Sequence, residues 1–274
     1  MTEIPLVGPM PQIGYGTWTQ TGDAARQCVL WALEAGYRHI DTAVGYGNEG
    51  EVGAALAEAR VAPAEVFVTT KIPPDHLGPG MVRPLVERSL EKLRTDQADL
   101  LLVHWPSPKI AMEDYLAQLG EVFDQGLARF VGMSNFTKDQ IDRAIGLLAP
   151  RTITTNQVEI HPLMQNRAIV EHCRRCDIPL TAYSPLARGA VADVPEIAAI
   201  ATAHGATPGQ VSLAFLMAEG FVVIPTSSPR IVAISASVSV TSSAARFSAM
   251  RGLDRGRRMV NPVSYTHLTL PTKA

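Results

Sequence analysis

Eight short apolar runs rich in β-branched residues alternate along this chain with segments whose apolar residues recur at helical spacing. Repeated strand–helix units favour a parallel sheet covered by helices, and eight of them favour closure into a (β/α)8 TIM barrel. The runs are Pro11–Trp18, Arg38–Thr42, Val66–Lys71, Asp99–His104, Phe130–Ser134, Thr154–Glu159, Leu180–Ser184 and Phe221–Pro225. Predicted helices include Gly22–Ala35, Glu49–Ala59, Met81–Arg94, Glu113–Gln125 and Thr207–Ala218. The sequence therefore predicts an α/β fold of the barrel class.

An open doubly wound sheet is the alternative architecture. Such a sheet needs fewer strands and usually has a glycine-rich phosphate loop after the first one. No G-x-G-x-x-G pattern follows any of the eight runs, so the barrel is the better interpretation.

Composition excludes several classes of partner. The chain has 274 residues, 46% of them hydrophobic, which is enough to bury one barrel-sized core. Its formal net charge of −2 is near balance and no run of like charges is present, so neither nucleic acid nor an anionic membrane is expected as a partner. No apolar run approaches the ~20 residues that span a bilayer. We expect a cytoplasmic monomer that acts on a small molecule.

Four polar residues at or just beyond the ends of neighbouring strands form a set suited to carbonyl chemistry. Lys71 and His104 end the third and fourth runs, Asp41 lies near the end of the second, and Tyr46 follows the second. In a barrel these strand ends share one rim. A phenol with a pKa of about 10 is a poor acid at neutral pH unless a buried cation stabilises its anion. Lys71 can supply that cation, Asp41 its counter-charge, and a neutral His104 a donor to the substrate oxygen.

Further polar residues are expected at the same rim on the later strands. They are Ser134 and Asn135 after the fifth run, Gln157 in the sixth, Tyr183 in the seventh, and Thr226 and Ser227 after the eighth. Such a ring of amides and hydroxyls, with one aromatic face, can hold a planar ring that carries an amide.

Each of these residues also has a simpler interpretation. A lysine at a strand end is commonly a solvated charge, and Asp41 before Thr42 is typical of a turn. A metal-dependent barrel hydrolase is a further alternative, but His39, His104 and His161 lack metal-ligand spacing with a carboxylate. We therefore expect no metal.

Six motifs in order resemble those of the aldo-keto reductase family, from about Pro5 to about Arg230. Within it the chain is most similar to bacterial 2,5-diketo-D-gluconate and methylglyoxal reductases, through Leu93–Asp96, His104–Pro108 and Gln165–Arg167. The six motifs are Asp41–Glu49, Thr69–Lys71, Leu102–Pro106, Gly132–Phe136, Asn156–Glu159 and Tyr183–Leu186.

The resemblance implies an enzyme that reduces the aldehyde or ketone carbonyls of small metabolites, 2-oxoaldehydes and keto-sugar acids, with NADPH, NADH being possible, and without a metal. It implies that Tyr46 protonates the carbonyl oxygen, that Lys71 and Asp41 tune its pKa and that His104 orients the carbonyl. The implied substrate wall is Trp18, Val44 and Trp105. The implied cofactor contacts are Ser134, Asn135, Gln157, Tyr183, Ser184, Leu186, Pro225, Thr226, Ser227 and Arg230.

The resemblance weakens after Ser228, which divides the chain into a predicted barrel domain, residues 1–230, and a divergent tail, residues 231–274. Residues 231–243 alternate like a strand where a helix is expected. We interpret the tail as partly disordered and as the product of a reading-frame disruption around residues 229–250. Arg230 is the only basic residue nearby, and Thr226 stands where many members carry lysine. A catalytically impaired or regulatory dinucleotide-binding protein is therefore the alternative function.

Overall fold

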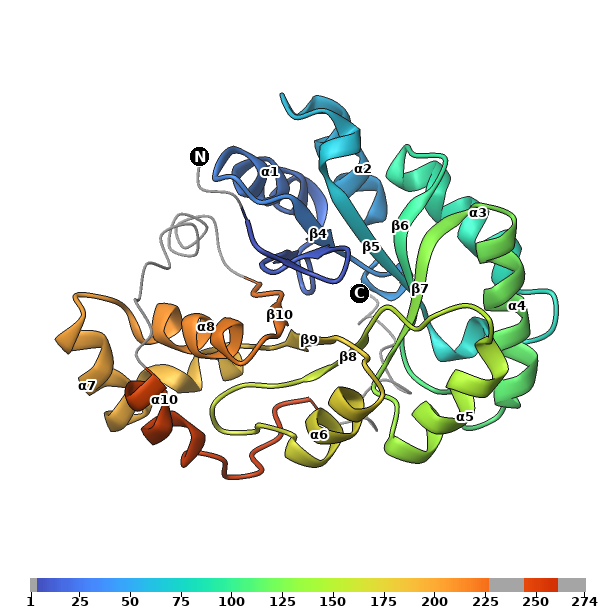
Figure 1. Ribbon diagram of the computed structural model, residues 1–274. Helices are drawn as coiled ribbons and strands as arrows, with labels where there is room; N and C mark the ends of the chain where they lie inside the picture. The colour runs from blue at the N-terminus through green and yellow to red at the C-terminus, as the bar shows by residue number, and fades with distance from the viewer. Residues whose placement is uncertain (1–3, 227–243, 261–274) are drawn as a thin grey trace, which may run out of the picture.

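The computed structural model describes residues 4–226 and 244–260, and its central feature is one parallel sheet of eight strands in chain order. Gly14 N donates to Val223 O at 2.9 Å and Ile13 bridges to Val223, so the first and last strands meet. The predicted (β/α)8 fold is confirmed (Figure 1). The strands are β3 (Tyr15–Gly16), β4 (His39–Asp41), β5 (Phe67–Ile72), β6 (Ala98–Val103), β7 (Ala128–Ser134), β8 (Asn156–Glu159), β9 (Leu180–Tyr183) and β10 (Val222–Val223).

Helices cover the outside of this sheet (Figure 1). Two of them begin at capping boxes, which Thr137 forms with Gln140 and Thr207 with Gln210. None of the helices in the described ranges is long and apolar enough to cross a membrane. The helices are α1 (Gly22–Glu34), α2 (Glu49–Glu58), α3 (Val82–Leu93), α4 (Met112–Asp124), α5 (Lys138–Leu148), α6 (Arg167–Arg175), α7 (Pro195–Ala203), α8 (Pro208–Ala218) and α10 (Ala244–Arg251).

The first predicted strand is divided in the structure. Met10–Pro11 forms β2, which pairs antiparallel with β1 (Leu6–Val7), and only Tyr15–Gly16 joins the main sheet as β3. Pro11 has no N–H for a ladder. Met10 is fully buried in an inner cluster that contains Phe67, Leu100, Leu102, Val222 and Ile224. The hairpin therefore contributes to the core of the barrel, and the single strand expected over Pro11–Trp18 is corrected.

Part of the predicted tail packs on the barrel. The Phe247 ring of α10 lies 5.6 Å from that of Phe215 in α8, centroid to centroid, and Phe247, Met250 and Leu253 are buried. Residues 231–243 and 261–274 lie outside the described residues. The boundary at 230 and the reading-frame disruption stay predictions.

Gly53 sets the distance between α2 and α3. A methyl group at this position would lie 2.1 Å from the Lys92 carbonyl oxygen, so Gly53→Ala must push the helices apart. We expect a loss of about 1–3 kcal/mol in the free energy of unfolding, measured by urea denaturation. Gly50→Ala in the same helix is the control, because no atom lies within 4 Å of its methyl position and helix propensity favours alanine. Equal stability of the two variants would contradict the prediction.

Candidate active site

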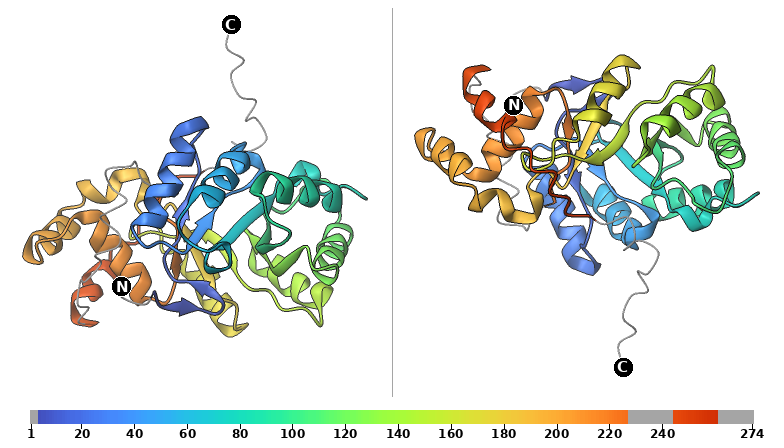
Figure 2. Two further views of the ribbon diagram at one scale, coloured as in Figure 1. Left: turned by 90° about the horizontal axis from the view of Figure 1, so that it is seen from above. Right: turned by 90° about the horizontal axis from the view of Figure 1, so that it is seen from below.

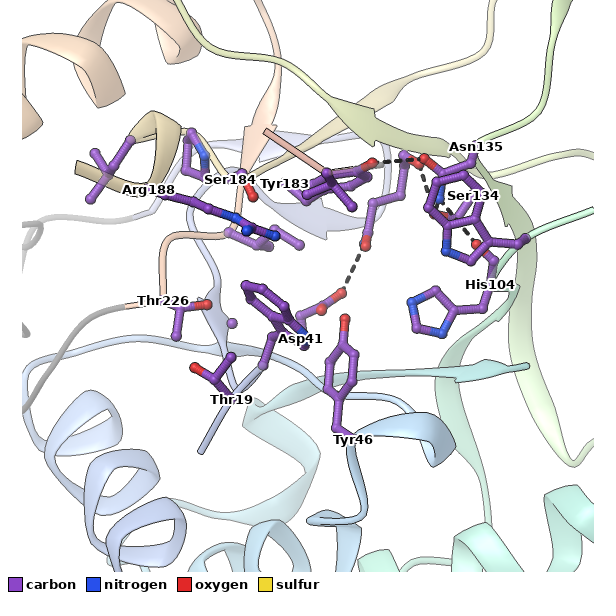
Figure 3. A pocket seen from close by; sticks show the side chains of 18 of the residues that line it. Thr19, Asp41, Tyr46, His104, Ser134, Asn135, Tyr183, Ser184, Arg188 and Thr226 are labelled. Carbon is purple, nitrogen blue, oxygen red and sulfur yellow. Dashed lines mark hydrogen bonds between the residues drawn. The ribbon is translucent and has the colours of Figure 1, made fainter. Parts of the chain in front are cut away.

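A cavity of about 370 Å³ lies at the carboxyl ends of the barrel strands. Figure 3 shows Asp41, Tyr46 and His104 facing this space, with Ser134, Asn135 and Tyr183 also around it. The structure thus brings together residues from seven strands and their following loops. The predicted residues that line it are Trp18, Asp41, Tyr46, His104, Trp105, Ser134, Asn135, Gln157, Tyr183, Ser184, Leu186 and Thr226.

A buried ion pair forms the floor behind Tyr46. Lys71 Nζ donates to Asp41 Oδ1 at 2.5 Å and to Thr42 O at 2.8 Å, and both charged residues are at most 1% exposed. Burial lowers the pKa of Lys71, whereas the carboxylate of Asp41 opposes that shift by favouring the ammonium. Because an isolated buried charge is costly, the two residues depend on each other.

The Tyr46 hydroxyl is directed at this pair. It lies 3.5 Å from Lys71 Nζ, which is 5.0 Å from the ring centroid. The turn that carries Tyr46 follows β4 as a short 3-10 helix, Val44–Tyr46, and ends at Gly47 with φ 69°. A positive φ of this kind favours glycine. The phenol is therefore placed next to a buried cation by local backbone geometry.

Asn48 fixes the turn from behind. Its side-chain oxygen accepts from Thr42 Oγ1 at 2.8 Å, and its Nδ2 donates to the carbonyl oxygens of Thr17 and Gln20 at 2.9 Å each. Asn48 is fully buried. It thereby ties the loop after β3, which carries Trp18, to the loop that carries Tyr46. Its place in the Asp41–Glu49 motif does not by itself indicate this role, because its partners Thr17 and Gln20 belong to another loop.

His104 packs edge-on against Tyr46, with ring centroids 5.5 Å apart and an interplanar angle of 75°. Burial, and secondly the charge of Lys71, hold the pKa of His104 well below its usual range. The imidazole is therefore neutral at physiological pH. A neutral imidazole can donate one hydrogen bond without adding a second positive charge beside Lys71.

The predicted amides form a connected network opposite Tyr46. Gln157 Nε2 donates to Asp41 Oδ2 at 2.8 Å, and Tyr183 Oη donates to Asn135 Oδ1 at 2.9 Å (Figure 3). Asn135 Nδ2 donates to Ser134 Oγ at 2.9 Å and to His104 O at 3.2 Å. Asn135 has φ 64°, in the left-handed region that asparagine tolerates better than most residues. Because Ser134 Oγ also donates to Gln157 O at 2.8 Å, the hydrogen bonds connect Asp41 to Tyr183 on the opposite side of the cavity.

Three of the predicted site residues that the structure describes lie outside this lining, and two more are not described. Of the described residues, Lys71 lies behind the cavity in contact with Asp41, Pro225 is buried with its carbonyl accepting from Gly16 N at 3.0 Å, and Val44 packs against the main core. Val44 and Pro225 are not among the lining residues described. Ser227 and Arg230 lie outside the described residues. The roles expected for these residues stay predictions.

Arg188, to which the sequence motifs assign no role, lines the cavity (Figure 3). Its guanidinium carbon lies 4.8 Å from the Trp18 ring centroid, a cation–π contact between the loops after β9 and β3. Arg188 has φ 51° in an irregular loop, and its approach to Trp18 depends on the closed sheet. Its place two residues after the Tyr183–Leu186 motif is the only sequence signal that could have found it.

One group of metal-ligating side chains lies elsewhere in the described part of the chain. Asp142, His172 and Cys176 come within 4.8 Å of one another on α5 and at the end of α6, and His172 Nε2 forms an ion pair with Asp142 at 2.8 Å. None of the three lines the cavity. The expectation that the active site uses no metal stays a prediction.

Comparisons with known proteins agree with this geometry. The model of the aldo/keto reductase family matches residues 12–254. A methylglyoxal reductase of Escherichia coli O157:H7 is 43% identical over 223 residues, 81% of this chain and 84% of that protein.

Solved structures are similar over nearly the whole length. That of a protein assigned as a 2,5-diketo-D-gluconic acid reductase B has a TM-score of 0.89 and 35% identity, covering 93% of each chain. That of an aldo-keto reductase of Bombyx mori in complex with NADP has a TM-score of 0.86 and 31% identity, covering 94% of each.

Proposed function

Because the chain belongs to the aldo/keto reductase family, we propose that it reduces the carbonyl group of small aldehydes or ketones to an alcohol with NADPH as hydride donor. The observation that carries this proposal is the buried Lys71–Asp41 pair behind Tyr46, with neutral His104 against the same phenol. This arrangement provides one proton donor, one cation to stabilise the donor's anion, and one uncharged group to hold the carbonyl oxygen.

Each residue has one role in the proposed reaction. His104 donates a hydrogen bond that holds the carbonyl oxygen near the Tyr46 hydroxyl. Tyr46 transfers its proton to that oxygen as negative charge develops there, and the ammonium of Lys71 stabilises the phenolate that remains. Asp41 keeps Lys71 protonated in spite of its burial. The proton balance closes when Tyr46 is reprotonated after the alcohol leaves.

The residues around the cavity fit a nicotinamide. Tyr183 presents an aromatic ring, and Ser134, Asn135 and Gln157 present hydroxyl and amide groups within one network. When bound, the reduced dinucleotide would supply the hydride to the carbonyl carbon. Ser184 and Leu186 would contact it from the loop after β9, and Thr226 from the end of β10. Ser227 and Arg230 remain proposed contacts.

NADPH is preferred in the proposal because the Bombyx mori relative was solved with NADP. Arg188 also places a guanidinium at the cavity, a group that binds the phosphates of either dinucleotide. For the substrate, the names of the relatives support 2-oxoaldehydes and keto-sugar acids.

The decisive experiment follows the absorbance of NADPH and NADH at 340 nm with methylglyoxal and, separately, with 2,5-diketo-D-gluconate. We expect oxidation that depends on the carbonyl and is faster with NADPH. Oxidation with neither cofactor, together with tight dinucleotide binding, would instead favour the catalytically impaired or regulatory alternative.

A further inference from the structure

Residues 254–260 form a segment that reaches the active-site cavity at its end. Among the described residues, its hydrogen-bond partners elsewhere in the chain lie in β8 and in the loop after β8. Arg255 N and Arg257 N both donate to Leu163 O at 3.1 Å, and Gln165 N donates to Asp254 Oδ1 at 3.2 Å. Figure 2, in the view from below, shows this segment crossing one end of the barrel. The segment ends at Val260, which lines the cavity.

Glu159 holds the last two described residues of this segment. Its Oε1 accepts from Met259 N at 2.5 Å and its Oε2 from Val260 N at 3.1 Å. The two oxygens of a carboxylate therefore bind two successive backbone N–H groups, a hundred residues further along the chain. Hydrogen bonds to an ionised acceptor are about twice as strong as neutral ones.

The carboxylate is buried and ionised. Glu159 is 1% exposed, and fully buried His161 lies with Nε2 3.1 Å from Glu159 Oε1. Burial acts to raise the pKa of Glu159, but the hydrogen bonds from His161, Met259 and Val260 outweigh it, so that the pKa lies below its usual range. A buried carboxylate that accepts hydrogen bonds from three donors is held in one position, unlike a mobile charge on the surface.

The Glu159 carboxylate is related to the active site by the geometry of β8. Alternate residues of a strand share a face, so Glu159 lies on the same face of β8 as Gln157, two residues nearer the carboxyl end of the strand. Gln157 contacts Asp41 in the cavity, and Val260 lines the same cavity. Strand β8 thus carries both Gln157, a polar residue of the cavity lining, and Glu159, which binds the backbone of the apolar lining residue Val260.

We propose that Glu159 is a positioning residue that fixes residues 259 and 260 at the rim, and so sets the affinity of the cavity for its carbonyl substrate. The substrate part rests on the proposed function. Glu159 does not touch the reacting atoms; it acts through the Val260 side chain. A change at Glu159 is therefore expected to alter substrate affinity and not turnover, because Lys71 and Asp41 behind Tyr46 are held by other contacts.

The test compares Glu159→Gln with the matched control Glu171→Gln on the exposed surface of α6. The glutamine keeps the shape but loses the charge and presents one NH2 group to a backbone N–H. We expect hydrogen–deuterium exchange of a peptide covering residues 255–260 to become about tenfold faster or more. We also expect the KM for methylglyoxal to rise about tenfold, with kcat and NADPH affinity within about twofold of wild type. Glu171→Gln should change none of these.

Val260→Ala completes the test. If Glu159 acts by placing Val260, each single substitution raises KM and the double variant is little worse than either one. Fully additive KM effects, a loss confined to kcat, or unchanged exchange at 255–260 in Glu159→Gln would overturn the proposal. Should Glu159→Gln not fold, Met259→Pro removes one donor with Glu159 in place, and the same exchange and KM changes are required.

The two proposals fail in different ways. A wild-type chain that oxidises no dinucleotide with any carbonyl contradicts the proposed function, and the exchange measurement still decides whether Glu159 anchors the segment. A wild-type chain that reduces methylglyoxal while Glu159→Gln leaves both exchange and KM unchanged contradicts the anchor alone.

Discussion

Replacing Tyr46 by phenylalanine is expected to lower the turnover number by at least about a hundredfold, because general acid catalysis contributes roughly 10²–10⁴-fold. The substitution removes one oxygen, which lies 3.5 Å from Lys71 Nζ, and leaves the ring against His104. Cofactor affinity should change little, since the aromatic and amide groups proposed to hold the nicotinamide lie on other strands. Steady-state turnover with methylglyoxal and fluorescence titration with NADPH measure the two effects.

Tyr115→Phe is the matched control for this substitution. Tyr115 is buried in α4 and is not among the described residues that line the cavity. It should keep wild-type turnover. Wild-type turnover in Tyr46→Phe would rule out Tyr46 as the proton donor and, with it, the proposed role of the Lys71–Asp41 pair.

Replacing Lys71 by methionine is expected to remove both activity and much of the stability. The apolar side chain leaves the carboxylate of Asp41, 1% exposed, without its cation. Breaking one partner of a buried pair costs about 3–5 kcal/mol, a large share of the ~5–15 kcal/mol that stabilises a typical domain. Urea denaturation measures the loss in the free energy of unfolding.

Two further variants isolate the cause. Lys71→Met combined with Asp41→Asn should regain part of the stability, because the uncompensated charge is gone, but not the turnover. Lys109→Met, at an exposed lysine, should stay within about 0.5 kcal/mol of wild type. A Lys71→Met chain as stable as wild type would show that the pair is not electrostatically coupled in the folded protein.

The members of the proposed catalytic group could be found because their positions follow from simple periodicities. Asp41, Lys71 and His104 lie at or next to the ends of runs of apolar residues, Tyr46 follows the first of these runs, and parallel strands of a barrel present their ends at one rim. The family motifs contain the same four residues. No long-range packing has to be known for this step, only that eight strand–helix units close.

The residues that were missed are those whose neighbours come from distant segments. Asn48 acts through the carbonyl oxygens of Thr17 and Gln20, and Arg188 through the ring of Trp18. The role inferred for Glu159 depends on backbone N–H groups a hundred residues away. In sequence these side chains look like ordinary polar residues of turns and strand ends.

The tail contains a helix, α10, whose packing on the barrel the sequence pattern did not indicate. The tail, residues 231–274, is predicted to be divergent and partly disordered, and in its described part Phe247 and Met250 of α10 are buried against the barrel. Burial of a few large apolar side chains is enough to hold a short helix that its own sequence would not stabilise.

By itself the sequence determined the barrel, the rim and which polar residues lie there as the proposed acid–base group, because alternating hydrophobic periods and strand-end positions are local properties of the chain. Only the tertiary structure decided how that group is enclosed: which loop places Arg188 over Trp18, and which carboxylate holds Val260 at the cavity. These contacts join segments far apart in sequence. They form because closure of the sheet brings the loops after β3 and β9 to one rim, and because a buried carboxylate must find donors wherever the fold supplies them.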